Sequence, residues 1–110
     1  TAAVAKTSAG AIEHMKIARV SNVAQTLDKL KKEGVWIVGT DADGDYSLFN
    51  CDLKGPVAVV VGSEGKGIGS LVKKKCDLVL SIPMVGKITS LNASVAASLV
   101  MYEVLRQRSL

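Results

Sequence analysis

Apolar positions along the chain follow two patterns, short continuous runs and runs at helical spacing. The continuous runs predict buried strands at residues 35–38, 57–61 and 78–80. Residues 57–61 are apolar at every position, which is typical of a central strand that is buried on both faces of a parallel sheet. Helical spacing predicts helices at 23–33, 71–75 and 92–108. Because strands alternate with helices, the pattern predicts an α/β domain with a mostly parallel sheet flanked by helices.

Shorter segments complete the pattern. Residues 17–20 alternate as a short strand does, and residues 46–53 suit a short helix or an edge segment. Ser21 or Asn22 can cap the helix at 23–33, and Gly34 can end it. Residues 41–45, Asp-Ala-Asp-Gly-Asp, are rich in turn formers and lack the spaced ligands and closing Glu of a calcium loop. We therefore expect a solvated surface turn there.

Composition narrows the class of protein. The chain's 110 residues fit one small domain, and 48% hydrophobic but only 4% aromatic content predicts an aliphatic core. No apolar run is long enough to cross a membrane. Cys51 and Cys76 lack metal-ligand spacing, so we expect reduced cysteines, a cytoplasmic location and no metal. The net charge of +4 mildly favours a polyanionic partner such as RNA.

A glycine-rich stretch at residues 62–69 follows the strand at 57–61 and precedes a helix. A phosphate-binding P-loop needs Gly-Lys followed by Ser or Thr, but Gly67 follows Lys66, and the alternate glycines also break the dinucleotide pattern. Glu64 would repel a phosphate. The stretch therefore favours a ligand without phosphates and with positive charge, such as S-adenosylmethionine. The alternative is a plain tight turn between strand and helix.

A second polar constellation joins the strand at 78–80 to the last helix. Pro83 ends the strand pairing, and Ser90, Asn92 and Ser94 gather polar groups near the unpaired backbone donors at the helix start. One of the three suffices as a cap, so together they indicate a role beyond capping. Residues 93 and 96–98 are all small, which lets this side of the helix pack either in the core or against a second copy.

These two constellations resemble the motifs of a known family, the SpoU (TrmH-type) RNA ribose methyltransferases. Residues 60–67 are similar to its second motif, and residues 82–96 with Tyr102 and Glu103 are similar to its third. Residues 5–18 also resemble the bacterial enzymes that methylate a guanosine ribose in 23S ribosomal RNA. The resemblance covers nearly the whole chain. It implies that residues 1–110 are the C-terminal part of a single SpoU-type methyltransferase domain.

The resemblance implies a fold, a cofactor and partners. The family fold is of the SPOUT type, in which a C-terminal segment forms a deep trefoil knot, and its members work as homodimers. S-adenosylmethionine would sit in the knot, largely on backbone groups, and the substrate would be RNA, with 23S ribosomal RNA as the closest parallel. By motif match, the cofactor-binding residues would be Thr40, Gly62, Gly65, Ile82, Met84 and Leu91.

The implied chemistry is the in-line transfer of a methyl group from a sulfonium to a ribose 2′-hydroxyl. The active-site residues would be Glu64, Ser90 and Asn92, of which the last two are suited to orient the ribose. Lys66 and Lys87 would bind RNA phosphates. The lysines at 73–75 suit either phosphate binding or a solvated helix end.

One family element and two rival functions stay open. The family's first motif carries an Arg proposed to activate the hydroxyl, and residues 1–110 contain no match to it. We expect it upstream, because the chain opens at Thr1 like a segment of a longer protein; whether this chain alone binds cofactor or is active is left open. The rival functions are a non-catalytic RNA-binding or dimerisation module on the same fold and a nucleotide-binding α/β protein, against which Glu64 argues.

Overall fold

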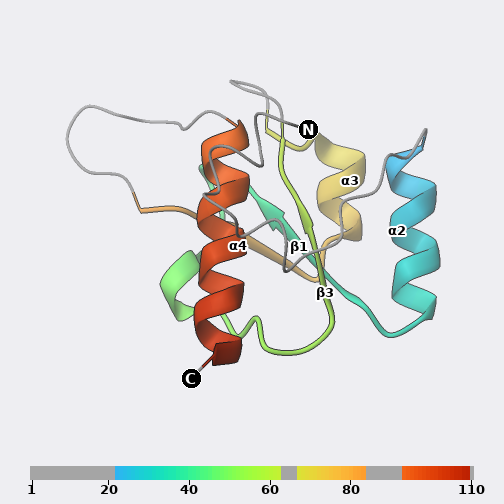
Figure 1. Ribbon diagram of the computed structural model, residues 1–110. Coiled ribbons are helices and arrows are strands. Elements are labelled where there is room, and N and C mark those ends of the chain that lie inside the picture. The colour runs from blue at the N-terminus through green and yellow to red at the C-terminus, as the bar shows by residue number, and fades with distance from the viewer. Residues whose placement is uncertain (1–21, 63–66, 84–92, 110) are drawn as a thin grey trace.

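A computed structural model of the protein describes residues 22–62, 67–83 and 93–109 (Figure 1). Its helices are α2 (Val23–Lys32), α3 (Ser70–Lys75) and α4 (Ala93–Ser109). Its strands are β1 (Trp36–Thr40), β2 (Tyr46–Ser47), β3 (Val57–Val60) and β4 (Leu78–Ser81), and the 3-10 helix η2 (Leu48–Asn50) follows β2.

The predicted elements that fall on described residues are confirmed, with bounds that shift by up to two residues. Residues 46–53 contain both predicted alternatives, because the edge strand β2 runs directly into η2. Asn22 caps α2 by accepting a hydrogen bond from the Gln25 N–H at 2.9 Å. The strand predicted at 17–20 lies outside the described residues.

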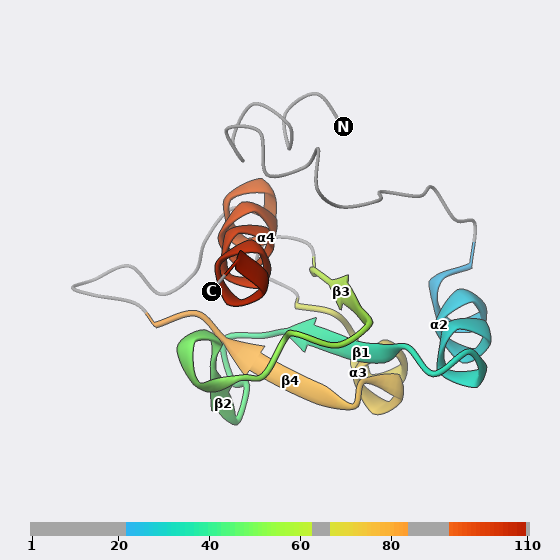
Figure 2. The ribbon, with the colours of Figure 1, turned by 60° about the horizontal axis from the view of Figure 1, so that its bottom comes forward.

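The four strands form one sheet in the order β2-β4-β1-β3, and every pair is parallel, as predicted (Figure 2). β1 is an inner strand, because Trp36 to Gly39 pair with β3 and Val38 to Thr40 pair with β4. The prediction that residues 57–61 form a central strand is wrong for the described sheet. β3 stands at its end, and all four of its residues are only half-buried. An apolar run predicts that both faces of a strand are covered, but it does not predict that the strand has a neighbouring strand on each side.

Helices cover both faces of the sheet. α2 and α3 lie side by side on one side, and α4 lies across the other (Figures 1 and 2). The core between the sheet, η2 and α4 is aliphatic, as the composition predicts; its fully buried members include Val38, Leu48, Leu53, Leu80 and Val100. The aromatic residues Trp36 and Phe49 are instead 56% and 65% exposed.

The two cysteines are free, as expected. Burial raises the pKa of the Cys51 and Cys76 thiols, and the neighbouring carboxylates Glu103 and Asp77 add to this effect. A raised pKa disfavours the thiolate, which is the reactive form of a cysteine. Among the described residues, no helix has the length and apolar character that crossing a membrane demands.

Because all described strands are parallel, their carboxyl ends lie along one edge of the sheet. This carboxyl edge comprises the end of β1 and the residues that follow β3 and β4. Ligands of open α/β sheets bind at such edges. The described residues do not show the C-terminal trefoil knot that the family resemblance implies, so the knot stays a prediction.

Candidate functional site

Three of the predicted cofactor-binding residues meet at the carboxyl edge. Thr40 ends β1, Gly62 comes two residues after β3, and Ile82 comes directly after β4. Thr40 is only 8% exposed, pairs with Leu80 of β4, and donates a hydrogen bond from its Oγ1 to the Val60 carbonyl at 3.3 Å. The end of β1 is therefore tied to both neighbouring strands. Residues that are far apart in sequence are brought to one place by the parallel pairing.

Gly62 lies against another residue of the glycine-rich stretch. A Cβ atom built on Gly62 would overlap the carbonyl group of Gly67, so the main chains of these two residues are in direct contact. Gly67 has φ of +66°, a left-handed conformation that favours glycine. Backbone packed this closely presents its own N–H and C=O groups rather than side chains. This suits both a tight turn and a cradle that binds an adenosyl group through backbone contacts.

Ile82 contributes to the edge in a different way. Its side chain packs against the buried core cluster, on the same apolar group as Val57, Val59 and Leu78. A ligand at this edge would therefore meet Ile82 mainly through its backbone. Both Gly62 and Ile82 thus fit a site that binds its ligand by main-chain groups.

The sequence predicts a solvated surface turn at residues 41–45, but two residues of this turn are partly buried. The Asp41 side chain is 19% exposed, and a Cβ atom on Gly44 would overlap the Leu80 carbonyl. Ala42, Asp43 and Asp45 are exposed, as expected. The prediction is therefore wrong for the two residues that the turn presses against β4 and the glycine-rich stretch.

Asp41 is the residue of this edge that the sequence analysis missed. Its N–H donates to the Leu80 carbonyl at 3.0 Å, and its Oδ1 accepts from the Asp43 N–H at 3.1 Å. Its Oδ2 lies 3.9 Å from the Lys73 Nζ of α3 and 2.8 Å from where a Cβ on Gly67 would stand. The signal that could have found it is its position, directly after a buried strand that ends at Thr40.

The other predicted site residues lie outside the described part of the chain. They are the active-site residues Glu64, Ser90 and Asn92, the cofactor residues Gly65, Met84 and Leu91, and the RNA-binding residues Lys66 and Lys87. Their roles stay predictions. Ala93 begins α4 directly after them.

α4 has a buried side and an exposed side. Ala96 and Ser98 are buried, and Ala93 and Ala97 are half-buried, so the small residues pack at least partly within the domain. On the exposed side, Leu99 and Tyr102 are each 41% exposed. The small residues thus face the core together with Val100 and Val104, while Leu99 and Tyr102 lie on the outer side of the helix.

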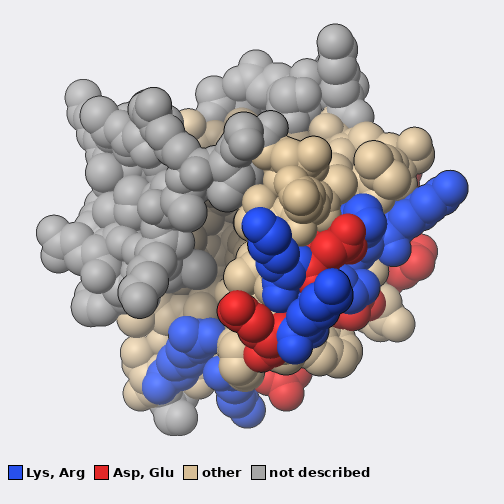
Figure 3. Space-filling model, turned by 90° about the vertical axis from the view of Figure 1, so that its right-hand side faces the viewer, with Lys and Arg blue, Asp and Glu red and all other residues tan. Residues whose placement is uncertain are grey.

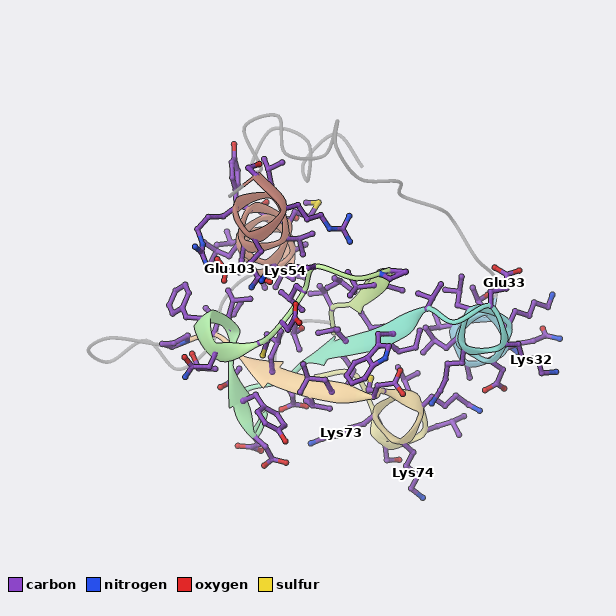
Figure 4. All side chains as sticks on the ribbon, turned by 90° about the horizontal axis from the view of Figure 1, so that it is seen from below. Lys32, Glu33, Lys54, Lys73, Lys74 and Glu103 are labelled. Carbon is purple, nitrogen blue, oxygen red and sulfur yellow. The ribbon has the colours of Figure 1, made fainter. Side chains whose placement is uncertain are left out.

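The C-terminal half of α4 is held by a side-chain network around Glu103, which is 5% exposed (Figure 4). Its carboxylate accepts hydrogen bonds from Arg106 at 2.6 and 3.1 Å and from Gln107 at 3.0 Å. The hydrogen bond from Arg106 lowers the pKa of Glu103, although burial opposes it. Gln107 in turn donates to the Cys51 carbonyl at 2.8 Å and accepts from the Leu53 N–H at 2.7 Å. This network fastens the helix to the segment after η2.

Two of the three lysines at 73–75 have acidic partners within the molecule. Lys75 binds Asp28 at 2.8 and 3.0 Å, and Lys73 pairs with Asp41. Lys73 extends from α3 along the sheet, whereas Lys74 points away from the domain (Figure 4). On the side of the molecule that carries α2 and α3, cationic and anionic side chains are interspersed (Figure 3). The arrangement favours a paired helix surface over a dedicated phosphate site for this run.

The sequence of the chain is similar to one family of RNA methyltransferases. The chain matches the sequence model of the SpoU rRNA methylase family over residues 1–102. It is 58% identical over 109 residues to YacO of Bacillus subtilis (strain 168) and 53% identical over 109 residues to a protein of Staphylococcus saprophyticus, both assigned to the TrmH family of tRNA/rRNA methyltransferases. These matches cover 99% of the chain but 44% of each relative, so the chain spans less than half of their length.

Solved structures share the fold. A TrmH/SpoU tRNA modifying enzyme from A. aeolicus superposes with a TM-score of 0.76 at 35% identity over 82% of the chain and 46% of that enzyme. The SpoU methyltransferase AviRb from Streptomyces viridochromogenes, in complex with AdoMet, gives a TM-score of 0.76 at 32% identity over 94% of the chain and 43% of AviRb. An RNA 2′-O ribose methyltransferase gives 0.78 at 32% identity over 96% of the chain and 41% of that protein. Together with the family match over residues 1–102, these likenesses establish that the chain belongs to the SpoU rRNA methylase family.

Proposed function

We propose that this chain supplies the methyl-donor site of an S-adenosylmethionine-dependent RNA ribose 2′-O-methyltransferase. The observation that carries the proposal is the carboxyl edge at which Thr40, Gly62 and Ile82 converge, with Gly62 in backbone contact with Gly67. Two relatives of similar fold support it, since one is described with AdoMet and another as an RNA 2′-O ribose methyltransferase. Gly65, Met84 and Leu91 are proposed to complete the donor site.

The described residues fit this donor. A cradle of glycine backbone beside the buried Thr40 suits a ligand that carries an adenosyl group and no phosphate. When bound, S-adenosylmethionine supplies an electrophilic methyl group on a sulfonium, which is already a good leaving group. The protein then has mainly to align the ribose oxygen with that methyl group and to remove the hydroxyl proton.

The transfer forms one bond and breaks one. The ribose 2′-oxygen bonds to the methyl carbon as the carbon–sulfur bond breaks, and the hydroxyl proton passes to a base. We propose that Ser90 and Asn92 orient the ribose and that Glu64 lines the reacting centre. The base proposed for the family is an Arg to which this chain has no match.

Within the RNA class, we propose a ribosomal substrate, a guanosine ribose of 23S RNA. The resemblance of residues 5–18 supports this choice, while the names of the curated relatives include both tRNA and rRNA. Lys66 and Lys87 are proposed to bind phosphates near the target. We further propose that the protein is cytoplasmic and works as a homodimer; the exposed apolar residues Leu99 and Tyr102 on α4 support a contact there.

Methyl transfer by the full product of the gene tests the proposal. Tritium from labelled S-adenosylmethionine is expected in ribose 2′-O-methylguanosine of unmodified 23S RNA and not in tRNA; label in tRNA alone would overturn the choice of ribosomal RNA. Calorimetry adds the binding step. S-adenosylmethionine binding without transfer to either RNA would favour the non-catalytic module, and competition by ATP but not by S-adenosylhomocysteine would favour a nucleotide-binding protein.

A further inference from the structure

Asp41 places a negative charge at the carboxyl edge, beside the proposed donor site. It follows Thr40 directly, and its Oδ2 faces the α-carbon of Gly67 in the glycine-rich stretch. The side chain is 19% exposed, so about four-fifths of its surface is removed from water. A charge in such a position acts more strongly on its surroundings than one on the open surface.

The carboxylate is fixed in place rather than free to swing into solvent. The backbone of Asp41 is bonded to Leu80 of β4 at 3.0 Å, and Oδ1 accepts from the Asp43 N–H at 3.1 Å. These contacts hold Oδ2 toward Gly67 and α3. Because Asn can accept the same hydrogen bond from Asp43, removal of the charge alone would leave this geometry intact.

Lys73 balances this charge only in part. Its Nζ lies 3.9 Å from Oδ2, at the outer limit of an ion pair, and its side chain is 43% exposed. Ion pairs of this kind are weak because water screens them and the lysine side chain loses entropy when it is held. Among the described residues, no other cation lies within ion-pair distance of Asp41, so its charge is only loosely paired.

We propose that Asp41 is a specificity-determining residue, which favours the cationic methyl donor over its neutral-sulfur product. This inference rests on the proposed function. S-adenosylmethionine carries a sulfonium charge that S-adenosylhomocysteine lacks, while the adenosyl and amino acid parts are the same. Methyl transfer removes that charge, so the attraction to Asp41 is lost at the moment when product must leave and new donor must enter.

The proposal is tested by the ratio of two dissociation constants, for S-adenosylhomocysteine and for S-adenosylmethionine, measured by calorimetry on the full product of the gene. Asp41→Asn is expected to lower this ratio by roughly three- to tenfold, through weaker donor binding and nearly unchanged product binding. Asp43→Asn is the matched control, because it removes the same charge from an exposed position in the same turn. Its ratio is expected to stay within about twofold of the native one.

A second pair of variants tests the same ratio of dissociation constants in the opposite direction. Lys73→Met removes the partial counter-charge and is expected to raise the ratio, whereas Lys74→Met, on the exposed side of the same helix, is expected to leave it unchanged. An unchanged ratio in Asp41→Asn, or an equal change in Asp43→Asn, would overturn the inference while leaving the proposed function standing. Failure of the native protein to bind S-adenosylmethionine would instead overturn the proposed function, and this inference with it.

Discussion

The two ends of the molecule are stabilised by different kinds of contact. At the carboxyl edge, main-chain atoms meet directly: Gly62 against Gly67 and Gly44 against Leu80. Around the C-terminal half of α4, side chains make the contacts, with Glu103 and Gln107 at the centre of the network. A side chain added at the carboxyl edge should therefore disturb ligand binding, whereas a side chain removed around the C-terminal half of α4 should disturb stability.

The largest effect is expected from Gly62→Ala. The added methyl group overlaps main-chain atoms of Gly67, which cannot rotate away as a side chain would. Keeping the native backbone contact would then cost about 3 kcal/mol or more, so the backbone is expected to leave its binding geometry. If binding must restore that geometry, S-adenosylmethionine affinity falls by about a hundredfold or more by calorimetry. Gly55→Ala is the control, because a Cβ there has no atom within 4 Å. Native-like donor affinity in Gly62→Ala would contradict the backbone-contact account of the site.

At the other end, Leu53→Ala is expected to destabilise the fold by about 2–5 kcal/mol, because Leu53 is fully buried beneath α4. Leu71→Ala makes the same change at a residue that is 61% exposed and should stay within about 0.5 kcal/mol of native. Urea denaturation measures both. If the two variants were equally stable, the segment after η2 would not be part of the core.

Loss of the Glu103 carboxylate should lower the free energy of unfolding by less than Leu53→Ala does. Glu103→Ala leaves Gln107 without one of its partners and Arg106 without its acceptor, at a cost of about 1–3 kcal/mol. Glu103→Gln keeps an acceptor and should lie between this variant and the native protein. Glu33→Gln, at an exposed position, is the control for the loss of charge. A Glu103→Ala variant as stable as the native protein would show that the network contributes little to folding.

The same carboxylate predicts a pH dependence. Because its pKa is lower in the folded state than its ordinary value of 4.5, the folded protein binds fewer protons at this site than the unfolded chain. Its contribution is therefore present above that value and is lost as the pH falls through the folded pKa. The stability gap between native protein and Glu103→Gln should shrink on acidification, as followed by thermal melts. A gap that widened as the pH fell would contradict the sign of this shift.

The smallest effect on stability is expected from the surface ion pair that links α3 to α2. Asp28→Asn removes the partner of Lys75, and the pair should contribute about 0–1 kcal/mol because Asp28 is 52% exposed. Added salt should reduce even this difference. A larger cost would mean that the contact between α2 and α3 depends on this pair more than exposed ion pairs usually allow.

Much of the fold could be predicted because its signals are local. Apolar runs and helical spacing located the described strands and helices, and the shortage of aromatic residues indicated the aliphatic core. The order of strands could not be found in this way, since pairing joins residues that are far apart in sequence. That is why residues 57–61 were predicted to be central although β3 ends the described sheet.

Part of the candidate site could be predicted where a motif marks it. Thr40, Gly62 and Ile82 came from the family resemblance and lie at one edge of the sheet, while their role in cofactor binding stays a prediction. Asp41 was missed because its local sequence, with alternating Asp residues and a Gly, is that of a surface turn. Its burial depends on Leu80 and Gly67, which lie far away in the chain. Local sequence therefore indicates the turn, but only the tertiary contacts show which of its residues faces the site.

Hydrogen exchange with and without S-adenosylmethionine, on the full product of the gene, tests the central claim most directly. Bound donor is expected to slow exchange of the amides at the carboxyl edge, at residues 40–41, 62, 67 and 81–82. The amides of residues 51–55, beneath the C-terminal half of α4, are expected to be unaffected. Protection at residues 51–55 with none at the carboxyl edge would contradict the assignment of the donor site.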